Sequence, residues 1–453
     1  MVGGGQSVAI PGMGPILESM ERGVIMKSSE NRVYGRSSSW HRWVVHEAPS
    51  KPRRQPVNVR RPDVMEVVQA EVERHYRSPI VEKIRSRQGK LTIGATTVRL
   101  ATQFGFCYGV ERAIDLAYAA RRVFPERRLF LIGEIIHNPE VNRQLADMGI
   151  AFLPWERMDG QYEDLTEEDV VIVPAFGAQT SFMKKLEQTG CYVIDTTCGD
   201  VMKVWRRVRT YAKAGATSII HGKKDHEETR ATASRAEGPD GAGHYLIVLT
   251  LEEADLVCDY IRHGGDREQF LERFGGATSR GFDPDLHLRE VGVANQTTML
   301  KSETEEIQRR IRSAIADRDQ STDRFQVFDT ICGATQERQD ALFELLKEHM
   351  DLLLVVGGYN SSNTSHLVEI GQEHLPTFFI RNAQCLASLE TIANYDLGAG
   401  HEIDSPYPER LLGDGPAVIG VTAGASCPAN LIEETILRVF ELRGVPRHEV
   451  EAA

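Results

Sequence analysis

The segment VIDTTCGDVMKVWRRV at residues 193–208 has a close counterpart in VFDTICGATQERQDAL at residues 327–342. Each consists of an apolar run typical of a β-strand, then Asp-Thr, one further residue and Cys-Gly, and then a stretch that reads as a helix. A third cysteine, Cys107, stands in a related position after the strand-like TVRL at residues 97–100. The sequence therefore places a cysteine between a strand and a helix three times.

The residues that follow each cysteine predict a helix with one apolar face. The predicted buried residues are Val110, Ala113, Ile114 and Ala117, then Val201, Val204, Trp205 and Val208, then Leu342, Leu345 and Leu346. About one helix later comes a strand that ends in a polar loop with glycine. These loops close LFLIGEIIHN (129–138), SIIHGKKDHEE (218–228) and LLLVVGGYNSSN (352–363). A second strand then ends in small or hydroxyl residues, in VVIVPAFGAQTS (170–181), VGVANQTTM (291–299) and AVIGVTAGAS (417–426).

This alternation of strands and helices predicts an α/β protein with three pseudo-equivalent domains. Ligands of open α/β sheets bind beyond the carboxyl ends of the strands. Three such units facing one another would bring the three cysteines and six polar loops to a common centre. The predicted organisation is an N-terminal extension over 1–94, α/β domains over 95–198, 199–330 and 331–426, and a C-terminal helix and tail over 427–453.

The first 62 residues are rich in Gly, Ser and Arg and have few acidic residues. No clear amphipathic Arg/Ser helix occurs there, which favours a flexible extension over a transit peptide. Residues 63–90 read as one or two helices.

The bulk composition excludes several classes of protein. The chain has 453 residues, 26% of them charged, and a net charge of −12, which argues against a nucleic-acid binder. No run approaches the 18 or so apolar residues of a membrane span. Seven dispersed cysteines suit a reducing compartment, with thiols that are free or metal-bound.

Three dispersed cysteines favour an iron–sulfur cluster over zinc. Zinc usually takes four ligands, often in CxxC pairs, and the chain has no CxxC. Cys107, Cys198 and Cys332 would leave one iron of a [4Fe–4S] cluster open to a substrate oxygen. The alternative is three small buried residues, which the matched settings make the weaker reading. The other cysteines lack this context and are predicted to be structural: Cys191, Cys258, Cys385 and Cys427.

The polar loops hold hydrogen-bond donors that could bind a diphosphate. These are His137, His226, Ser361, Ser362, Asn363 and Ser426. A Ser-Ser-Asn run is also a common helix N-cap. Residues 296–298 (QTT) could be a turn only, or could orient a substrate hydroxyl.

His226-Glu227-Glu228 is not a zinc-hydrolase motif, because Arg230 occupies the position of the second histidine. The spacing alone favours a solvated helix face for Glu228. A carboxyl near a cluster could instead have a raised pKa and deliver protons.

The chain has neither a dinucleotide fingerprint nor a Walker A loop, so electrons would come from a separate protein. The Arg-rich segment WRRVR (205–209) is read as the solvated side of a helix in preference to a docking patch for an electron donor.

Eight segments in order carry a resemblance to a known family: FGFCYGVERAI, HNPEVNRQL, DTTCGDVMKVW, HGKKDHEETRATAS, ANQTTM, DTICGATQERQDA, GGYNSSNTSHL and VTAGAS. Together they closely resemble the 4-hydroxy-3-methylbut-2-enyl diphosphate reductase family, over about residues 95 to 440. This family catalyses the last step of the methylerythritol phosphate route to isoprenoids. The resemblance implies three α/β domains in a trefoil around one [4Fe–4S] cluster.

The resemblance also implies roles for individual residues. Cys107, Cys198 and Cys332 would hold the cluster, whose open iron would bind the allylic hydroxyl of the substrate. Glu228 would supply protons, with His226 and Thr297. The residues implied in substrate binding are His137, His226, Thr297, Thr298, Ser361, Ser362, Asn363 and Ser426. A ferredoxin- or flavodoxin-type protein would deliver two electrons, and the products would be isopentenyl and dimethylallyl diphosphate.

One position departs from the family pattern. Many bacterial members have a histidine where this chain has Phe176, which removes one diphosphate donor. The segments PAFGA and HGKKDHEET and the insertion around 255–290 are similar to the plant and cyanobacterial branch. This similarity keeps the plastid stroma open as an alternative location, because plant members are imported, and a bacterial cytoplasmic enzyme is the preferred expectation.

Two other functions remain open at this point. A quinolinate-synthase-like iron–sulfur dehydratase would need no electrons. A non-catalytic iron–sulfur sensor would need no substrate clamp.

Overall fold

The computed structural model describes residues 32–36, 43–47, 58–154, 165–238, 240–328, 330–408 and 415–453. The chain divides into two units, residues 1–56 and 57–453. In the first unit, β1 (Arg32–Arg36) and β2 (Trp43–Glu47) pair as an antiparallel hairpin that the sequence pattern did not predict. The remainder of the predicted flexible extension up to residue 57 lies outside the described residues.

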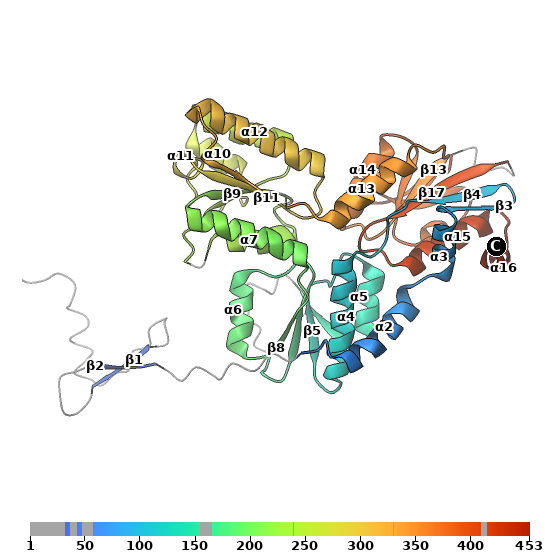
Figure 1. Cartoon of the computed structure of the whole chain (residues 1–453), viewed down its shortest axis with the longest axis horizontal. Helices are drawn as coiled ribbons and strands as arrows, with labels where there is room; N and C mark the ends of the chain where they lie inside the picture. Colours follow the sequence, from blue (N-terminus) through green and yellow to red (C-terminus); the bar gives the residue numbers. More distant parts are fainter. Residues whose placement is uncertain are drawn as a thin grey trace, which may run out of the picture. The chain divides into compact units, whose positions relative to one another are not determined.

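Among the described residues of the second unit, three sheets have four parallel strands each in an equivalent order, besides one two-stranded antiparallel sheet (Figure 1). The first has the order β6-β5-β7-β8, with β5 (Leu129–Ile132), β6 (Ile150–Leu153), β7 (Val170–Val173) and β8 (Tyr192–Asp195). The second has the order β10-β9-β11-β12, with β9 (Thr217–His221), β10 (Tyr245–Val248), β11 (Val291–Asn295) and β12 (Phe325–Val327). The third has the order β14-β13-β17-β4-β3, with β13 (Leu352–Val356), β14 (Thr377–Ile380), β17 (Ala417–Ala423), β4 (Thr96–Leu100) and the antiparallel β3 (Lys90–Ile93).

Helices connect the strands of each sheet. The first domain has α4 (Tyr108–Val123), α5 (Pro139–Asp147) and α6 (Thr180–Thr189). The second has α7 (Gly199–Ala214), α8 (Glu227–Ala236), α9 (Leu251–His263), α10 (Arg267–Arg273), α11 (Pro284–His287) and α12 (Lys301–Asp319). The third has α13 (Gly333–Leu345), α14 (Ser362–Gln372), η2 (Ala383–Cys385), α15 (Ala429–Leu442) and α16 (Arg447–Ala452), and the antiparallel pair β15 (Thr391–Asp396) and β16 (His401–Pro406). The mixed α/β class with parallel sheets is as predicted.

Each cysteine lies where the chain passes from one sheet to the next domain. β8 and β12 are the last strands of the first and second sheets, and the helices after them, α7 and α13, belong to the following domain. The third sheet is completed by β4, which precedes the first domain and pairs with β17 from Ala417↔Thr96 to Val421↔Leu100. The predicted assignment of residues 95–100 to the first domain is therefore wrong. β4 and its partner β17 lie more than 300 residues apart, and a local sequence pattern cannot predict that two such distant strands pair.

The segments outside the three domains of the prediction also join these cores. The region 63–90 forms two helices, α2 (Pro62–Tyr76) and α3 (Pro79–Ser86). Residues of α2 pack with α4 in the core of the first domain, and residues of α3 and α15 pack in the core of the third. The insertion around 255–290 supplies Phe270, Phe274 and Phe282 to the core of the second domain.

The apolar faces predicted after the cysteines are confirmed. The apolar residues predicted to be buried after Cys107 and Cys198 are all buried, as are Leu342 and Leu345, while Leu346 is half-buried. Burial of these faces against the sheets fixes where each helix begins, and hence where each cysteine lies.

Candidate active site

Cys107, Cys198 and Cys332 are the N-cap residues of α4, α7 and α13. One end of each of these helices points toward the place where the three domains meet (Figure 1). None of the three side chains makes a capping hydrogen bond. Helix N-termini carry unpaired N–H groups and a partial positive charge, which stabilise thiolates and other anions. Three positive helix ends therefore face one centre.

The spacing of the sulfur atoms suits a group larger than one metal ion. A Cβ atom on Gly109 would lie 2.5 Å from Sγ of Cys198 and 3.8 Å from Sγ of Cys107, so both sulfurs lie close to the first turn of α4. A single zinc ion with Zn–S bonds of about 2.3 Å would hold its thiolates about 3.8 Å apart. Within the described ranges, no cysteine belongs to a group of three candidate ligand atoms that all lie within 4.8 Å of one another. The three thiols therefore fit a cluster better than zinc.

Burial favours the neutral, protonated form of these thiols when no cation is bound. Desolvation raises the pKa of Cys332 to about 12 and raises the pKa of Cys198 as well. A coordinated thiol is deprotonated because the cation compensates the charge that burial disfavours.

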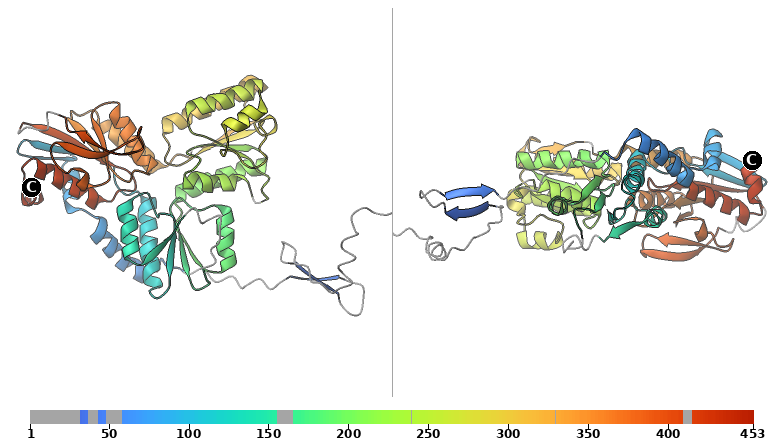
Figure 2. Two further views of the ribbon diagram at one scale, coloured as in Figure 1. Left: turned by 180° about the vertical axis from the view of Figure 1, so that it is seen from behind. Right: turned by 90° about the horizontal axis from the view of Figure 1, so that it is seen from below.

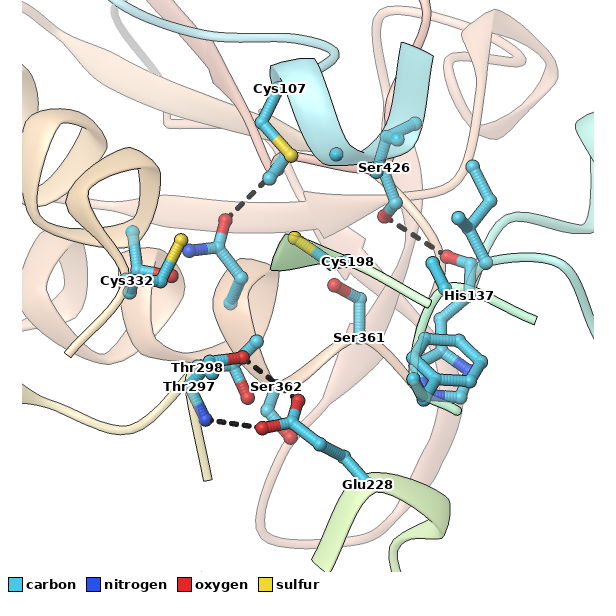
Figure 3. A pocket seen from close by; sticks show the side chains of 18 of the residues that line it. Cys107, His137, Cys198, Glu228, Thr297, Thr298, Cys332, Ser361, Ser362 and Ser426 are labelled. Carbon is cyan, nitrogen blue, oxygen red and sulfur yellow. Dashed lines mark hydrogen bonds between the residues drawn. The ribbon is translucent and has the colours of Figure 1, made fainter. Parts of the chain in front are cut away.

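Glu228 lies at the opposite side of the same cavity (Figure 3). Its side chain accepts hydrogen bonds from N–H of Thr297 at 2.6 Å and from Oγ1 of Thr297 at 2.9 Å. The residue is only 2% exposed, so the solvated helix face favoured by the spacing is wrong. Desolvation raises the pKa of Glu228 to about 7, although the two hydrogen bonds from Thr297 lower it. A carboxyl with this pKa can hold a proton at neutral pH and release it.

Gln296 holds three of the polar loops together. Its Oε1 accepts hydrogen bonds from N–H of Lys223 at 3.1 Å and from Oγ1 of Thr229 at 3.0 Å. Its Nε2 donates to Oγ of Ser362 at 3.3 Å and to Oγ1 of Thr298 at 2.7 Å. The QTT segment is therefore a turn that positions side chains of the second and third domains.

The two predicted histidines face each other, with their Nε2 atoms 3.2 Å apart. Nδ1 of His226 accepts the N–H of Glu228 at 3.1 Å, so a neutral His226 carries its proton on Nε2. Nδ1 of His137 lies 3.0 Å from Oε2 of Glu134, to which it donates. Burial lowers the pKa of His226 well below its usual value, which keeps that ring neutral.

His137, His226 and Glu227 are also close enough to hold a metal ion. A metal on Nε2 of His226 would require a proton on Nδ1, where the N–H of Glu228 already donates. The local hydrogen bonds therefore make His226 a donor and not a metal ligand. Phe176 stacks on His137 with ring centroids 4.3 Å apart and planes at 17°. Phe176, which stands where many family members have a histidine donor, thus fixes the orientation of the His137 ring.

The third domain contributes the hydroxyl and amide groups. Ser361 is the N-cap of α14, as such runs often are, and also lines the cavity. Oδ1 of Asn363 accepts the N–H of Ala425 at 3.0 Å, while its buried Nδ2 has no partner in the part of the chain that the structure describes. Oγ of Ser426 donates to the carbonyl of His137 at 3.2 Å. A buried amide donor without a partner is what an anionic ligand would satisfy.

All twelve predicted site residues line this one cavity. The cysteines, Glu228 and the serines are labelled in Figure 3. The model of the family described as LytB protein matches residues 98–440. The chain belongs to the LytB family. It is 50% identical over 386 residues to the 4-hydroxy-3-methylbut-2-enyl diphosphate reductase of Gloeobacter violaceus, which covers 83% of this chain and 90% of the relative. It is 46% identical over 380 residues to the enzyme of the same name from a Synechococcus strain, covering 83% and 93%.

The fold is also that of a solved structure, the E-1-hydroxy-2-methyl-but-2-enyl-4-diphosphate reductase from Plasmodium falciparum. The two chains align with a TM-score of 0.55 and 22% identity, over 75% of this chain and 86% of that one. Neither a quinolinate-synthase-like dehydratase nor a sensor is supported by the family match.

Sequence reasoning missed three residues around the cysteines of this LytB protein. Arg338 on α13 is buried, and its Nη2 donates to the carbonyls of Gly105 at 2.6 Å and Phe106 at 3.2 Å, which ties the loop before Cys107 to the third domain. Asp200 Oδ2 lies 3.4 Å from Sγ of Cys332, and Tyr108 Oη lies 3.9 Å from Sγ of Cys198. From sequence alone, a charged residue in a helix is predicted to face solvent. No local pattern therefore indicated that Arg338 and Asp200 lie near the cysteines. The four other cysteines are buried and line no part of this cavity, as predicted.

Gly109→Ala is expected to lower the iron and sulfide content of the purified protein several-fold. The added Cβ would lie 2.5 Å from Sγ of Cys198, where no side chain can stay without moving that sulfur. Gly333→Ala is the matched control, since it alters a glycine beside Cys332 whose Cβ would meet nothing within 4 Å. Equal iron content in the two variants would contradict the expected clash.

Proposed function

We propose that this chain reduces (E)-4-hydroxy-3-methylbut-2-enyl diphosphate to isopentenyl and dimethylallyl diphosphate, the last step of the methylerythritol phosphate route. The proposal is supported by the family match and by relatives of that name, among them one at 50% identity. The observation that carries it is one cavity lined by three N-cap cysteines, a buried carboxyl and two facing histidines. Each turnover converts a C–OH bond to C–H, consumes two electrons and two protons, and releases water.

We propose Cys107, Cys198 and Cys332 as the ligands of one [4Fe–4S] cluster that leaves one iron without a protein ligand. Two observations support this ligand set: the three sulfurs do not all lie within 4.8 Å of one another, and each cysteine stands at a helix N-terminus. When bound, the cluster would supply electrons and a Lewis acid at the substrate hydroxyl.

The side chains of the cavity divide the remaining work. Glu228, when protonated, donates to Oγ1 of Thr297, and that hydroxyl can in turn donate toward the substrate hydroxyl, which places a proton where water must leave. His226 through Nε2–H, Asn363 through Nδ2 and the serine hydroxyls are suited to hold the diphosphate. Ile136, Ala175 and Phe176 line the cavity with apolar surface, which strengthens these polar interactions by excluding water.

We further propose that a ferredoxin- or flavodoxin-type protein delivers the electrons.

None of the helices in the described residues has the length and apolar character of a membrane span. The cyanobacterial origin of relatives supports a bacterial cytoplasmic location over the plastid stroma.

The test is anaerobic oxidation of a reduced viologen by the cluster-reconstituted protein, with and without the substrate. Oxidation that depends on substrate, with both products identified by mass spectrometry, would support the proposal. A protein with full iron and sulfide content but no substrate-dependent oxidation would sink it.

The turnover rate is expected to fall as the pH rises through about 7, the pKa of Glu228. Proton donation needs the protonated carboxyl, whose fraction is constant well below this pKa and drops about tenfold per pH unit above it. The measurement is kcat with viologen and saturating substrate between about pH 6 and pH 9. A rate that stays level across this range would exclude Glu228 as the proton donor.

A further inference from the structure

The exposed face of α7 carries cations and no carboxylate. Its exposed charged residues are Lys203, Arg206, Arg207, Arg209 and Lys213. The one acidic residue of the helix, Asp200, is buried and pairs with Lys203 at 2.6 Å. In the part of the chain that the structure describes, no ion pair is found for Arg206, Arg209 or Lys213. We call these five residues the α7 stripe.

Apart from Lys203, the cations of the stripe have no carboxylate partner among the described residues, although the net charge of the protein is −12. Several exposed arginines elsewhere are paired, such as Arg122 with Glu71 and Arg309 with Glu306. Arg207 stacks over the ring of Phe328, with its guanidinium carbon 3.8 Å from the centroid, so its contact is aromatic and leaves the charge uncompensated. The stripe therefore attracts an acidic surface that the rest of this protein would repel.

The stripe starts beside one of the three cysteines. Cys198 is the N-cap of α7, and Met202 in the first turn is 37% exposed. Tyr108 is 54% exposed, its Oη lies 3.9 Å from Sγ of Cys198, and the same oxygen would be 2.9 Å from a Cβ on Gly199. An exposed aromatic ring thus lies beside the cysteine at the end of the stripe, an exposed methionine follows in the first turn, and α7 runs outward from the centre (Figures 1 and 2).

We propose that Tyr108, Met202 and the α7 stripe form the docking surface for an acidic one-electron carrier protein. This inference rests on the proposed function, which needs two electrons per turnover from outside the chain. A small apolar contact above the redox centre allows the short approach that electron transfer requires, and surrounding charges orient a short-lived complex. Each encounter oxidises one carrier molecule by one electron, so two encounters complete one reduction. The neighbouring helices carry exposed carboxylates, Glu111 on α4 and Glu337 on α13, which would repel an acidic carrier. The carrier is therefore attracted to α7 and not to these helices.

The experiment compares two electron donors with the same holoenzyme. One is a reduced acidic [2Fe–2S] ferredoxin, and the other is a reduced viologen, which needs no docking surface. In Arg206→Glu/Arg209→Glu, kcat/KM for the ferredoxin is expected to fall about tenfold or more at low ionic strength, and the difference should shrink as salt is added. Viologen-driven turnover should stay within about twofold of the unaltered chain, because neither arginine lines the active-site cavity.

Arg312→Glu is the matched control, since Arg312 is an exposed arginine on α12 in the same domain. It should leave both rates unchanged. If the charge reversal also lowers the viologen-driven rate, the milder Arg206→Gln/Arg209→Gln replaces it. In this variant only the ferredoxin-driven rate should fall.

Three results would overturn the docking surface. The first is a ferredoxin-driven rate in the double variant equal to that of Arg312→Glu. The second is an equal loss of rate with both donors in the milder variant. The third is binding of a random DNA duplex that depends on the stripe and is as tight as binding of the ferredoxin. Failure of the proposed function is distinguishable, because the unaltered chain would then show no substrate-dependent viologen oxidation.

Discussion

Cys198→Ala is expected to yield a folded protein that retains little iron and sulfide and shows no substrate-dependent turnover. Two of the three proposed thiolate ligands would remain, and even outer-shell partners of a metal cost about 10- to 100-fold in affinity when they are lost. Cys107→Ala and Cys332→Ala should behave alike, because all three cysteines cap equivalent helices. The measurements are iron and sulfide content, visible absorbance and viologen-driven rate.

Cys258→Ala is the matched control for this loss. Cys258 is also a free cysteine, but it is 1% exposed, whereas Cys198 is half-buried, and it lies in the core of the second domain and lines no part of the cavity. It should keep full iron content and activity, with circular dichroism of both variants confirming the fold. Unaltered iron content in Cys198→Ala would remove Cys198 from the ligand set.

The repeat of strand, cysteine and helix could be found from sequence because every part of it is local. An apolar run, a cysteine and a helical face such as Val201, Val204 and Val208 lie within about 15 residues, and burial of that face fixes the cysteine at the helix start. Threefold recurrence then predicted the common centre. The α/β class, the three cysteines and the polar loops follow from this reasoning.

The features that sequence reasoning missed depend on partners far along the chain. β4 belongs to the third sheet because β17 pairs with it, and Arg338 is buried because the loop before Cys107 accepts its hydrogen bonds. Glu228 read as solvated because it opens a polar helix, and its burial comes from the loop of Thr297, 69 residues later. The family resemblance supplied a role for Glu228 that the spacing did not.

Glu228→Gln is expected to lower kcat by about 10²- to 10⁴-fold, the usual contribution of a positioned acid, with little change in KM. Glutamine keeps the shape of the side chain and can still accept the N–H of Thr297, but it cannot release a proton at neutral pH. The diphosphate would be held by other side chains, so substrate binding should survive. The cluster absorbance should also be unchanged, because Glu228 is not among the proposed ligands.

Glu237→Gln separates loss of the proton donor from general damage to the helix. Glu237 is the C-cap residue of α8, at the other end from Glu228, and burial raises the pKa of its carboxyl too, yet it does not line the cavity. This variant should turn over within about twofold of the unaltered chain, as surface changes away from a site usually do. Were Glu228→Gln to keep the full rate at neutral pH, the proton would have to come from another group. His226 would not be that group, since burial keeps its ring neutral. The substrate diphosphate or a water held by Thr297 would then be the remaining source.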